Sequence, residues 1–369
     1  MNKFENARKA INEIDLEMAH LFEKRMKAAK DIADYKKENG LPVFDAEREK
    51  QIIGRNSDYI IDPVIREYYI NFIKDTMDIS KRYQCRLMNG MKVAYSGVIG
   101  AFAHIASCKI FPDAEKISYP NFKEAYNAVV NGLCDCAVLP LENSYGGDVT
   151  QVYDMAFEGN LYINGVYELP VTQELVGLSA SGISDIKTVI SHSQALSQCA
   201  DYIKNHGFAQ IQYENTALAA KYVAEKGDPS LAAIASRESA EIYGLKVIDK
   251  NINDSGSNTT RFGVFSRVQN ERIGYDPDDK FILMFTVRNE AGALAEAMNI
   301  IGRRGFNMIS IKSRPMHRLL WEYYFYVECE GAVHSENGKR MLEQLAMFCD
   351  KLKIAAVYNS NNNLGKEMN

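Results

Sequence analysis

The sequence predicts three consecutive domains of different fold class: an all-helical domain, an α/β domain and an α+β domain of the ferredoxin-like kind. Its 369 residues correspond to two or three domains at about 100–200 residues each. The segment before Tyr83 shows apolar residues at helical spacing and no strand pattern. From Met91 onward, short β-rich runs alternate with helical stretches, and the last part follows the order β-α-β-β-α-β. We expect domain boundaries at residues 1–88, 91–270 and 280–360.

The composition excludes several classes of protein. Lys and Arg total 43 and Asp and Glu total 48, so the net charge is −5, without the basic stripe that nucleic-acid binding requires. The apolar runs are too short to span a membrane, and the charged N-terminus lacks the apolar core of a signal peptide. The seven cysteines are scattered, and Cys134 and Cys136 have no second ligand pair at metal-binding spacing. We therefore expect a cytoplasmic location and no metal, membrane or nucleic-acid partner.

One long amphipathic helix is predicted from Asn2 to about Gly40, because apolar residues recur every three or four positions. A helix of roughly 36 residues spans ~54 Å. A domain of this size cannot cover so long an apolar stripe, so we expect a homodimer or a higher homo-oligomer. Asp45 is expected to begin a second, short helix, and Asp62-Pro63 a third.

The charged residues on these helices are typical either of snorkelling or internally paired side chains or of a site for a small anion. At 100° per residue, Arg25 and Lys36 lie within about 40° of Ile14, on the stripe expected to be buried. The other two helices carry polar side chains that share one face: Asp45, Arg48 and Glu49, then Thr76 and Ser80. Buried cations need anionic partners, which are either carboxylates of the chain or a small dicarboxylate ligand. Arg8 points elsewhere on the wheel, which suits a contribution to another subunit's site.

This helical segment resembles the all-helical class of chorismate mutase. The residues that carry the resemblance are Ala7-Arg8, Arg25, Lys36 and the run Pro42-Val43-Phe44-Asp45-Ala46-Glu47-Arg48-Glu49. The resemblance implies that Arg25, Arg48 and Arg8 of the partner subunit hold the two carboxylates of chorismate. Lys36 would donate to the ether oxygen and Glu49 would bind the ring hydroxyl. Asp45 and Ser80 complete the expected site, and whether Ser80 or Gln84 takes the place of the family's glutamine stays open.

The α/β segment is expected to contain largely parallel sheets, arranged as one sheet or two small lobes. The expected strands are Lys92–Tyr95, Cys136–Leu139, Thr188–Ser191, Ala232–Ala235 and Arg261–Phe265, and the expected helices are Phe122–Asn131, Gln194–Asn205 and Thr216–Glu225. Polar groups lie where strands end or helices begin, which is where α/β proteins bind ligands. On their own, Asn143, Ser144 and Gln198 are equally typical of turns and helix caps.

Motifs of this segment resemble prephenate dehydratase, in the order in which that family carries them. They are Gly97-x-x-Gly100-x-Phe102-x-His104, Glu142-Asn143-Ser144, Ser191-His192-x-Gln194-Ala195-Leu196-x-Gln198-Cys199, Ala240-Glu241-x-Tyr243-Gly244-Leu245 and Thr260-Arg261-Phe262. The resemblance implies a two-lobed fold like that of periplasmic binding proteins. It also implies that Thr260 gives a proton to the leaving hydroxyl, that Arg261 lies near a substrate carboxylate, and that Asn143, Ser144 and Gln198 belong to the site.

The last segment resembles the ACT regulatory domain attached to prephenate dehydratases. The resemblance rests on Gly292-Ala293-Leu294-Ala295 and Ser313-Arg314-Pro315. It implies feedback by L-phenylalanine at a dimer interface formed by these residues and Lys312. Lys312 replaces a glutamate that the family commonly carries, and Ala295 replaces a common valine, so the strength of feedback stays open. The alternative is a module that serves dimerisation alone.

Together these resemblances predict a bifunctional enzyme of phenylalanine biosynthesis, with chorismate and prephenate as substrates and no cofactor. The isomerase step is a pericyclic rearrangement, which needs a held conformer and stabilised charge rather than a nucleophile. Two alternatives remain: a ligand-binding regulator that has lost its chemistry, and a dehydratase whose helical segment only dimerises. Substitution of Arg25 by alanine separates the second alternative from an active mutase.

Overall fold

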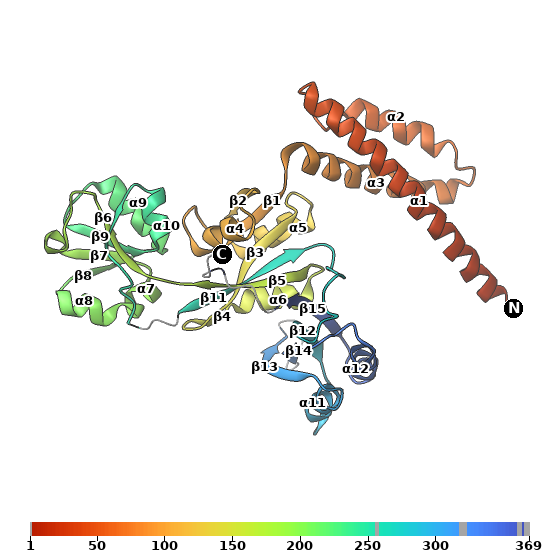
Figure 1. Cartoon of the computed structure of the whole chain (residues 1–369). Coiled ribbons are helices and arrows are strands. Elements are labelled where there is room, and N and C mark those ends of the chain that lie inside the picture. Colours follow the sequence, from red (N-terminus) through yellow and green to blue (C-terminus); the bar gives the residue numbers. More distant parts are fainter. Residues whose placement is uncertain (1, 255–257, 317–322, 360–363, 365–369) are drawn as a thin grey trace. The chain divides into compact units, whose positions relative to one another are not determined.

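The computed structural model describes residues 2–254, 258–316, 323–359 and 364, and it divides into two compact units. The helical unit covers residues 1–92 and the large unit covers residues 93–369. Figure 1 labels the elements of both units.

The helical unit consists of α1 (Lys3–Glu38), α2 (Ala46–Ser57) and α3 (Pro63–Asn89). Each helix begins after a side-chain cap, since Asn2, Asp45 and Asp62 all accept hydrogen bonds from backbone N–H groups of the first turn. The predicted starts at Asp45 and Asp62-Pro63 and the predicted end near Gly40 are confirmed.

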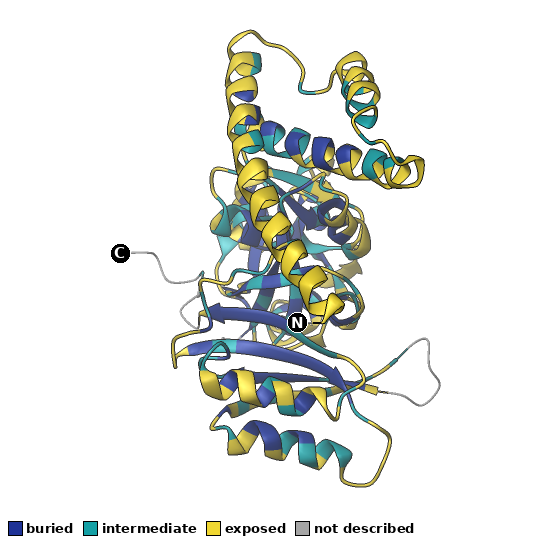
Figure 2. Ribbon diagram, turned by 90° about the vertical axis from the view of Figure 1, so that its right-hand side faces the viewer, coloured by how far each residue is buried: buried dark blue, intermediate teal, exposed yellow. Residues whose placement is uncertain are grey.

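The buried line of α1 differs from the one expected. It runs through Ala29 and Ala33, which are buried, whereas Ile14 and Ile32 are 55% and 49% exposed, and α1 lies in contact with α3. The two alanines are small, so α3 can approach α1 closely on their side of the helix. Arg25 lies beside this line and is half-buried. Figure 2 shows that most of α1 is exposed within the single chain.

The large unit contains two sheets. A ten-stranded sheet has the order β13-β14-β12-β15-β5-β11-β3-β1-β2, with β4 paired to β3, and a five-stranded sheet has the order β10-β6-β9-β7-β8. The strands are β1 (Lys92–Ser96), β2 (Glu115–Tyr119), β3 (Cys136–Asn143), β4 (Gly147–Asp148), β5 (Tyr162–Pro170), β6 (Glu174–Gly177), β7 (Thr188–Ser191), β8 (Ala209–Gln212), β9 (Leu231–Ala235), β10 (Lys246–Asp249), β11 (Thr259–Ser266), β12 (Asp279–Thr286), β13 (Asn307–Pro315), β14 (Tyr323–Glu330) and β15 (Leu352–Asn359). The helices are α4 (Phe102–Ile110), α5 (Phe122–Val130), α6 (Thr150–Glu158), α7 (Ser193–Gln198), α8 (Ala200–His206), α9 (Thr216–Lys226), α10 (Arg237–Ile242), α11 (Ala293–Arg303) and α12 (Glu336–Ala346), with a short 3₁₀ helix at Ile183–Asp185.

Residues 93–266 form two lobes. The larger lobe holds β1–β5 and β11 with α4–α6, and the smaller lobe holds β6–β10 with α7–α10. The chain passes between the lobes twice, from β5 to β6 and from β10 to β11 (Figure 1). Of the two arrangements left open by the sequence, two lobes is therefore the observed one.

The expectation of largely parallel sheets is wrong. β1 pairs with β3 in parallel, but β11 pairs antiparallel with both β3 and β5. In the smaller lobe β7 is parallel to β8 and β9, whereas β6 is antiparallel to β9 and β10. The mixed pairing arises because β11 re-enters the larger lobe after the second passage, opposite in direction to the strands already there.

The C-terminal domain, residues 279–359, has the predicted order β12-α11-β13-β14-α12-β15. Its strands pair antiparallel, and β15 pairs in parallel with β5 at Ala356 and Ile163, which joins this sheet to that of the larger lobe. Alternate residues of β12 face opposite sides. Phe281 and Leu283 pack with α11 and α12, whereas Ile282 and Met284 belong to the core of the larger lobe. Figure 2 shows the buried strands above these two helices.

Candidate active sites

A cavity of about 370 Å³ lies between the two lobes. Its lining includes Asn143 and Thr260 from the larger lobe and Gln198 from the smaller lobe, which are three of the residues expected in the dehydratase site. The other lining residues are Ala101, Phe102, Phe122, Val171, Gln173, His192, Gln194, Ala195, Glu214, Asn215, Thr216 and Asn258. The fold therefore brings together side chains that are more than 100 positions apart in the sequence.

Asn143 is held in one orientation and contacts Thr260. Its Oδ1 accepts hydrogen bonds from the backbone N–H groups of Tyr145 (3.0 Å) and Gly146 (2.7 Å). Two backbone donors can only meet an oxygen, so the amide nitrogen must point the other way. Asn143 Nδ2 then donates to Thr260 Oγ1 at 2.9 Å and to Asn258 Oδ1 at 2.8 Å. Because Thr260 Oγ1 accepts this bond, its own proton is available for a ligand in the cavity.

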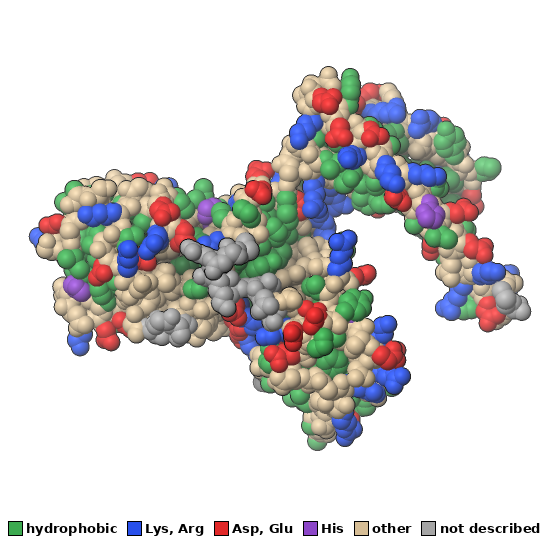
Figure 3. Space-filling model, in the orientation of Figure 1, with side chains coloured by type: hydrophobic (Ala, Val, Ile, Leu, Met, Phe, Trp, Pro, Cys, Tyr) green, Lys and Arg blue, Asp and Glu red, His purple; other side chains and the backbone are tan. Residues whose placement is uncertain are grey.

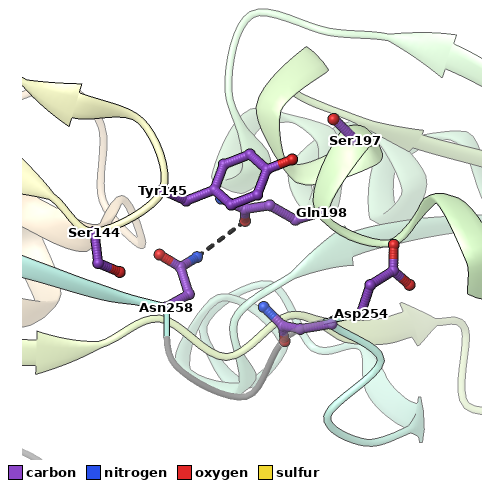
Figure 4. Close-up of a pocket in the computed structure, with 7 residues that line it drawn as sticks. Ser144, Tyr145, Ser197, Gln198, Asp254 and Asn258 are labelled. Carbon is purple, nitrogen blue, oxygen red and sulfur yellow. Dashed lines mark hydrogen bonds between the residues drawn. The ribbon is translucent and has the colours of Figure 1, made fainter.

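The chain of amides continues into the smaller lobe. Asn258 Nδ2 donates to Gln198 Oε1 at 3.0 Å (Figure 4), and Gln173 Nε2 lies 3.4 Å from the same oxygen. Sequence reasoning missed Asn258 and Gln173 as site residues. Asn258 stands two positions before Thr260, so its place next to the quoted Thr260-Arg261-Phe262 motif was an available signal. Nothing in the local sequence pointed to Gln173.

Ser144 lies apart from the larger cavity. It lines a smaller one of about 120 Å³, together with Tyr145, Ser197, Gln198, Asn253, Asp254 and Asn258 (Figure 4). Ser144 Oγ accepts a hydrogen bond from the backbone N–H of Thr259 at 2.9 Å, so it ties β3 to β11 at the end of both strands. Gln198 and Asn258 line both cavities.

Arg261 faces away from the larger cavity. Neighbouring residues of a strand point to opposite faces, so Thr260 points into the cavity and Arg261 points toward the C-terminal domain. Its guanidinium donates to Glu142 (2.7 Å), to both oxygens of Glu328 (2.6 and 3.0 Å) and to the hydroxyl of Tyr358 (2.7 Å). The structure thus does not bring Arg261 to the place expected for a substrate carboxylate.

Glu142 and Glu328 are ionised members of this network. Burial alone would raise the pKa of each carboxyl, but hydrogen bonds from Arg261 to both, and from Lys312 to Glu142, outweigh burial and lower both pKa values. Lys312 donates to Glu142 Oε2 at 2.5 Å and to Asp148 Oδ1 at 2.6 Å. Burial would lower the pKa of Lys312, but these partners raise it. A cation of the C-terminal domain is therefore bonded to the residue that precedes Asn143.

The expected phenylalanine-binding residues lie in two places. Lys312 and Arg314 of β13 face the larger lobe, where Arg314 lies 3.4 Å from Asp154, whereas Ser313 and Pro315 are exposed on the opposite face. Gly292, Ala293, Leu294 and Ala295 lie at the start of α11, where Gly292 has a φ of 88° that a side chain would strain. A cavity of about 350 Å³ adjoins this helix start and is lined by Thr286, Val287, Arg288, Asn289, Glu290, Leu294, Tyr323, Phe325 and Asp350.

In the helical unit, Arg25 lies against α3. Its Nη1 donates to Ser80 Oγ and, at 3.3 Å, to the carbonyl of Thr76. Ser80 and Thr76 are buried, and burial lowers the pKa of Arg25. The predicted proximity of Arg25 and Ser80 is therefore observed. Gln84, one turn later, is also buried, and its Oε1 has no hydrogen-bond partner in the described part of the chain.

The other expected mutase residues are spread around α2. Lys36 Nζ donates to the carbonyl of Val43 at 2.7 Å, which fixes the turn between α1 and α2. Asp45 and Arg48 are exposed, and the Asp45 carboxylate accepts from the Arg48 backbone N–H as a helix cap. Glu49 forms an ion pair with Lys81 at 2.7 Å.

Three further features belong to the helical unit: Lys81, Arg8 and a groove along α1 and α3. Lys81, which follows Ser80 on α3, was missed by sequence reasoning, although its position next to an expected site residue was a signal. Arg8 is exposed and lies 4.2 Å above the ring of Phe4, away from the residues above. A groove of about 760 Å³ is lined by Asp15, Met18, Ala19, Leu21, Phe22, Arg25, Tyr69, Phe72, Ile73, Thr76 and Ile79. Figure 3 shows hydrophobic side chains gathered on this unit.

Residues 2–254, 258–316 and 323–359 hold no group of three or more His, Cys, Asp or Glu side chains placed to bind a metal ion. None of the helices described is both long and apolar enough to cross a membrane.

Comparison with known proteins gives two family matches. Residues 93–270 match the family model of prephenate dehydratase, and residues 7–85 match that of chorismate mutase type II. The bifunctional chorismate mutase/prephenate dehydratase of Aquifex aeolicus (strain VF5) is 31% identical over 365 residues, covering 97% of this chain and 98% of the relative.

Solved structures resemble the large unit. Prephenate dehydratase from Arthrobacter aurescens in complex with L-Phe is 28% identical with a TM-score of 0.67, covering 73% of this chain and 90% of that chain. GqqA, described as a novel type of quorum quenching acylase, is also 28% identical with a TM-score of 0.68, covering 73% of this chain and 98% of that chain. Because one fold hosts different activities, function has to be argued from the residues of the sites.

Proposed function

The chain belongs to the bifunctional chorismate mutase/prephenate dehydratase family, and from this premise we propose how its residues divide the two reactions. It rearranges chorismate to prephenate and converts prephenate to phenylpyruvate. Phenylpyruvate is the keto acid of phenylalanine, so the chain serves phenylalanine biosynthesis.

For the mutase reaction we assign the helical unit. Arg25 and Arg48 of one chain, with Arg8 of a second copy, hold the two carboxylates of chorismate. Lys36, together with Ser80 or Gln84, serves the ether oxygen. The half-buried position of Arg25 supports this assignment, since desolvation strengthens its attraction for a carboxylate.

Glu49 is assigned to the ring hydroxyl of chorismate, with Asp45 beside it. Glu49 lies in an ion pair with Lys81, which would have to open or tilt when the hydroxyl binds. Lys81 then remains as a counter-charge to Glu49. Gln84 Oε1 has no hydrogen-bond partner among the described residues, which supports a role for this side chain in binding a polar ligand.

One observation carries the dehydratase assignment: the 2.9 Å hydrogen bond from Asn143 Nδ2 to Thr260 Oγ1 in the cavity between the lobes. Thr260 gives its proton to the ring hydroxyl as the C–O bond breaks, and the oxygen leaves as water. The electron pair of the C–CO2 bond enters the ring, CO2 departs and the ring becomes aromatic. Thr260 regains a proton from solvent. Asn143 and Gln198 position the substrate, and Ser144 holds the ends of β3 and β11 together.

In our assignment Arg261 is a positioning residue, which lies on the face of β11 opposite the cavity. Its bonds to Glu142 and Glu328 occupy the guanidinium, which argues against a direct contact with a substrate carboxylate. Arg261 pairs with Glu142 across β11 and β3, next to the pair of Thr260 and Asn143. The buried ion pair thereby fixes the backbone that presents the two site residues.

The C-terminal domain is proposed to be an ACT domain that binds L-phenylalanine as a feedback effector. The β-α-β-β-α-β order and the cavity at the start of α11 support this, as does the L-Phe complex of the Arthrobacter relative. Because Lys312 and Arg314 are bonded to the larger lobe, we place the effector near residues 292–295 and on the exposed face of Ser313 and Pro315.

We also propose a homodimer or higher oligomer that packs α1 against a second copy. Apolar side chains along α1 are exposed in the single chain, among them Ile11, Ile14 and Leu21. A cytoplasmic location is proposed because all seven cysteines are free, as they are in a reducing compartment.

The assignment of the helical unit is tested by Arg25→Ala. Mutase turnover is expected to fall by at least about a hundredfold, since removing one charge-stabilising group at a reacting centre costs about that much. Dehydratase turnover of added prephenate is expected to stay the same. Lys24→Ala, which removes an exposed cation one position away, is the control and should leave both rates unchanged. An Arg25→Ala chain with normal mutase turnover would rule the site out.

A further inference from the structure

Gln173 carries a polar atom that nothing in the described protein satisfies. The residue lies between β5 and β6, where the chain passes from one lobe to the other, and only 2% of it is exposed. Its backbone is fixed on both sides: the N–H donates to Asn253 Oδ1 at 2.7 Å, and the carbonyl accepts from Ile252 N–H at 2.9 Å. Its side chain lines the cavity that Thr260 also lines.

The orientation of the Gln173 amide follows from the chain of amides beside it. Backbone N–H groups fix Asn143, which directs its nitrogen to Asn258 Oδ1, so Asn258 must turn its own nitrogen to Gln198. Gln198 Oε1 therefore faces Asn258 and Gln173. Gln173 has to present its nitrogen to that oxygen, because a reversed amide would bring two oxygens together.

This orientation leaves Gln173 Oε1 as a buried acceptor without a donor among the described residues. Buried polar atoms are almost always hydrogen-bonded, and an unpaired one calls for an explanation. Its position in the wall of a ligand cavity of about 370 Å³ supplies one: the missing donor belongs to the ligand.

The chemistry of prephenate selects which ligand atom this is. The dianion carries two carboxylates and a keto oxygen, all of which are acceptors that Gln173 Oε1 would repel. Its single donor is the ring hydroxyl. We propose that Gln173 is a substrate-binding residue whose Oε1 accepts a hydrogen bond from the ring hydroxyl of prephenate and thereby turns the hydroxyl oxygen toward Thr260. This rests on the dehydratase function proposed above.

The proposed hydrogen bond to Gln173 orients the ring hydroxyl in the bound substrate and is kept while the C–O bond breaks. With its proton held by Gln173, the hydroxyl oxygen directs its lone pairs to the Thr260 proton. When the C–O bond breaks, that oxygen takes the Thr260 proton and the bonding electron pair, and it leaves as water. The departing water keeps its original proton and still donates it in a hydrogen bond to Gln173 Oε1. An ordered water in that place without substrate is the alternative occupant, and it predicts a different result below.

The test is Gln173→Met in the full-length chain, since methionine is close in volume and has no amide. We expect kcat/KM for prephenate to fall about ten- to a hundredfold. The inhibition constant of phenylpyruvate, which lacks the ring hydroxyl, should stay within twofold. The thermal midpoint should change little, because removal of the buried unpaired acceptor offsets the loss of the 3.4 Å contact from Gln173 Nε2 to Gln198 Oε1. Mutase turnover on the same preparation should not change.

Gln269→Met is the matched control. Gln269 also has a buried unpaired amide atom, its Nε2, but it does not line the cavity, so kcat/KM for prephenate should stay unchanged. The proposal is overturned if Gln173→Met retains normal kcat/KM for prephenate, or if phenylpyruvate binding and the thermal midpoint fall together with activity, as loss of a structural water would cause. A wild-type chain without prephenate turnover would instead refute the proposed dehydratase function.

Discussion

Replacement of Thr260 by valine tests the proton donor with little disturbance of the fold. Valine keeps the branched shape and removes only the hydroxyl. Thr260 is 8% exposed, and its Oγ1 accepts a hydrogen bond from Asn143 Nδ2. In the valine variant, Asn143 Nδ2 can still donate to its other acceptor, Asn258 Oδ1. Loss of one such bond costs about 1 kcal/mol of folding free energy. A positioned general acid contributes about 10²–10⁴ in rate, or about 3–5 kcal/mol of activation free energy.

The expected result is thus a large loss of rate in a protein that stays folded. Phenylpyruvate formation from prephenate should fall at least about a hundredfold. Mutase turnover in the same sample serves as the internal control for folding. Thr259→Val, one residue away and outside the cavity lining, should keep dehydratase turnover within about twofold. If Thr260→Val retains more than about a tenth of wild-type turnover, Thr260 is not the proton donor.

Three further predictions follow from the same contacts. Lys312→Met removes one of the two described cations bonded to Glu142 and leaves Arg261, so dehydratase turnover should fall about three- to tenfold. Lys351→Met breaks a different contact with the larger lobe and should not change dehydratase turnover. Equal losses in both variants would contradict the assignment. The folded-state pKa values of Glu142 and Glu328 lie below their ordinary value of 4.5, so their contribution to stability is complete above that pH and is lost as the pH falls through the folded-state values. The thermal unfolding midpoint, followed by near-UV circular dichroism, should therefore drop steeply below about pH 4.5. A thermal midpoint that stays constant down to about pH 3 would refute this. L-phenylalanine should lower phenylpyruvate formation without changing the Arg25-dependent mutase step, and turnover that is insensitive to L-phenylalanine would leave the C-terminal domain a dimerisation module.

Local signals in the sequence were sufficient for much of the secondary structure. Helix caps located α2 and α3, because a capping side chain acts within three residues of the helix start. The strand expected at Thr188–Ser191 has those bounds in the structure. The helix expected at Gln194–Asn205 is two helices that meet at Cys199, a break that no glycine or proline marks. Strand direction was wrongly predicted, since it depends on where the chain returns between the lobes.

Some residues of the candidate sites were likewise indicated by the sequence, and others were misplaced or not found. Asn143, Gln198 and Thr260 share one cavity, and the sequence motifs had indicated all three. Arg261 was misplaced, although alternation along a strand already implied that neighbours such as Thr260 and Arg261 face opposite sides. Gln173 could not have been found from sequence, because its role depends on an amide orientation set by residues of both lobes.

The stripe on α1 shows a further limit. Helical periodicity correctly grouped Ile14, Arg25 and Ile32, but it could not say which side of the helix α3 would cover. The structure shows that Ala29 and Ala33 are the covered positions and that the isoleucines stay exposed. An apolar surface left uncovered in one chain is what the proposed second copy would cover, so the oligomer remains a prediction of the pattern.

The most direct test of the central claim supplies the purified full-length chain with chorismate alone and follows prephenate and phenylpyruvate over time. Two active sites on one chain predict that chorismate disappears, that prephenate appears first, and that phenylpyruvate accumulates after a lag without any added enzyme. Prephenate that accumulates without phenylpyruvate would contradict the dehydratase site. Chorismate that is not consumed, while added prephenate is, would contradict the mutase site.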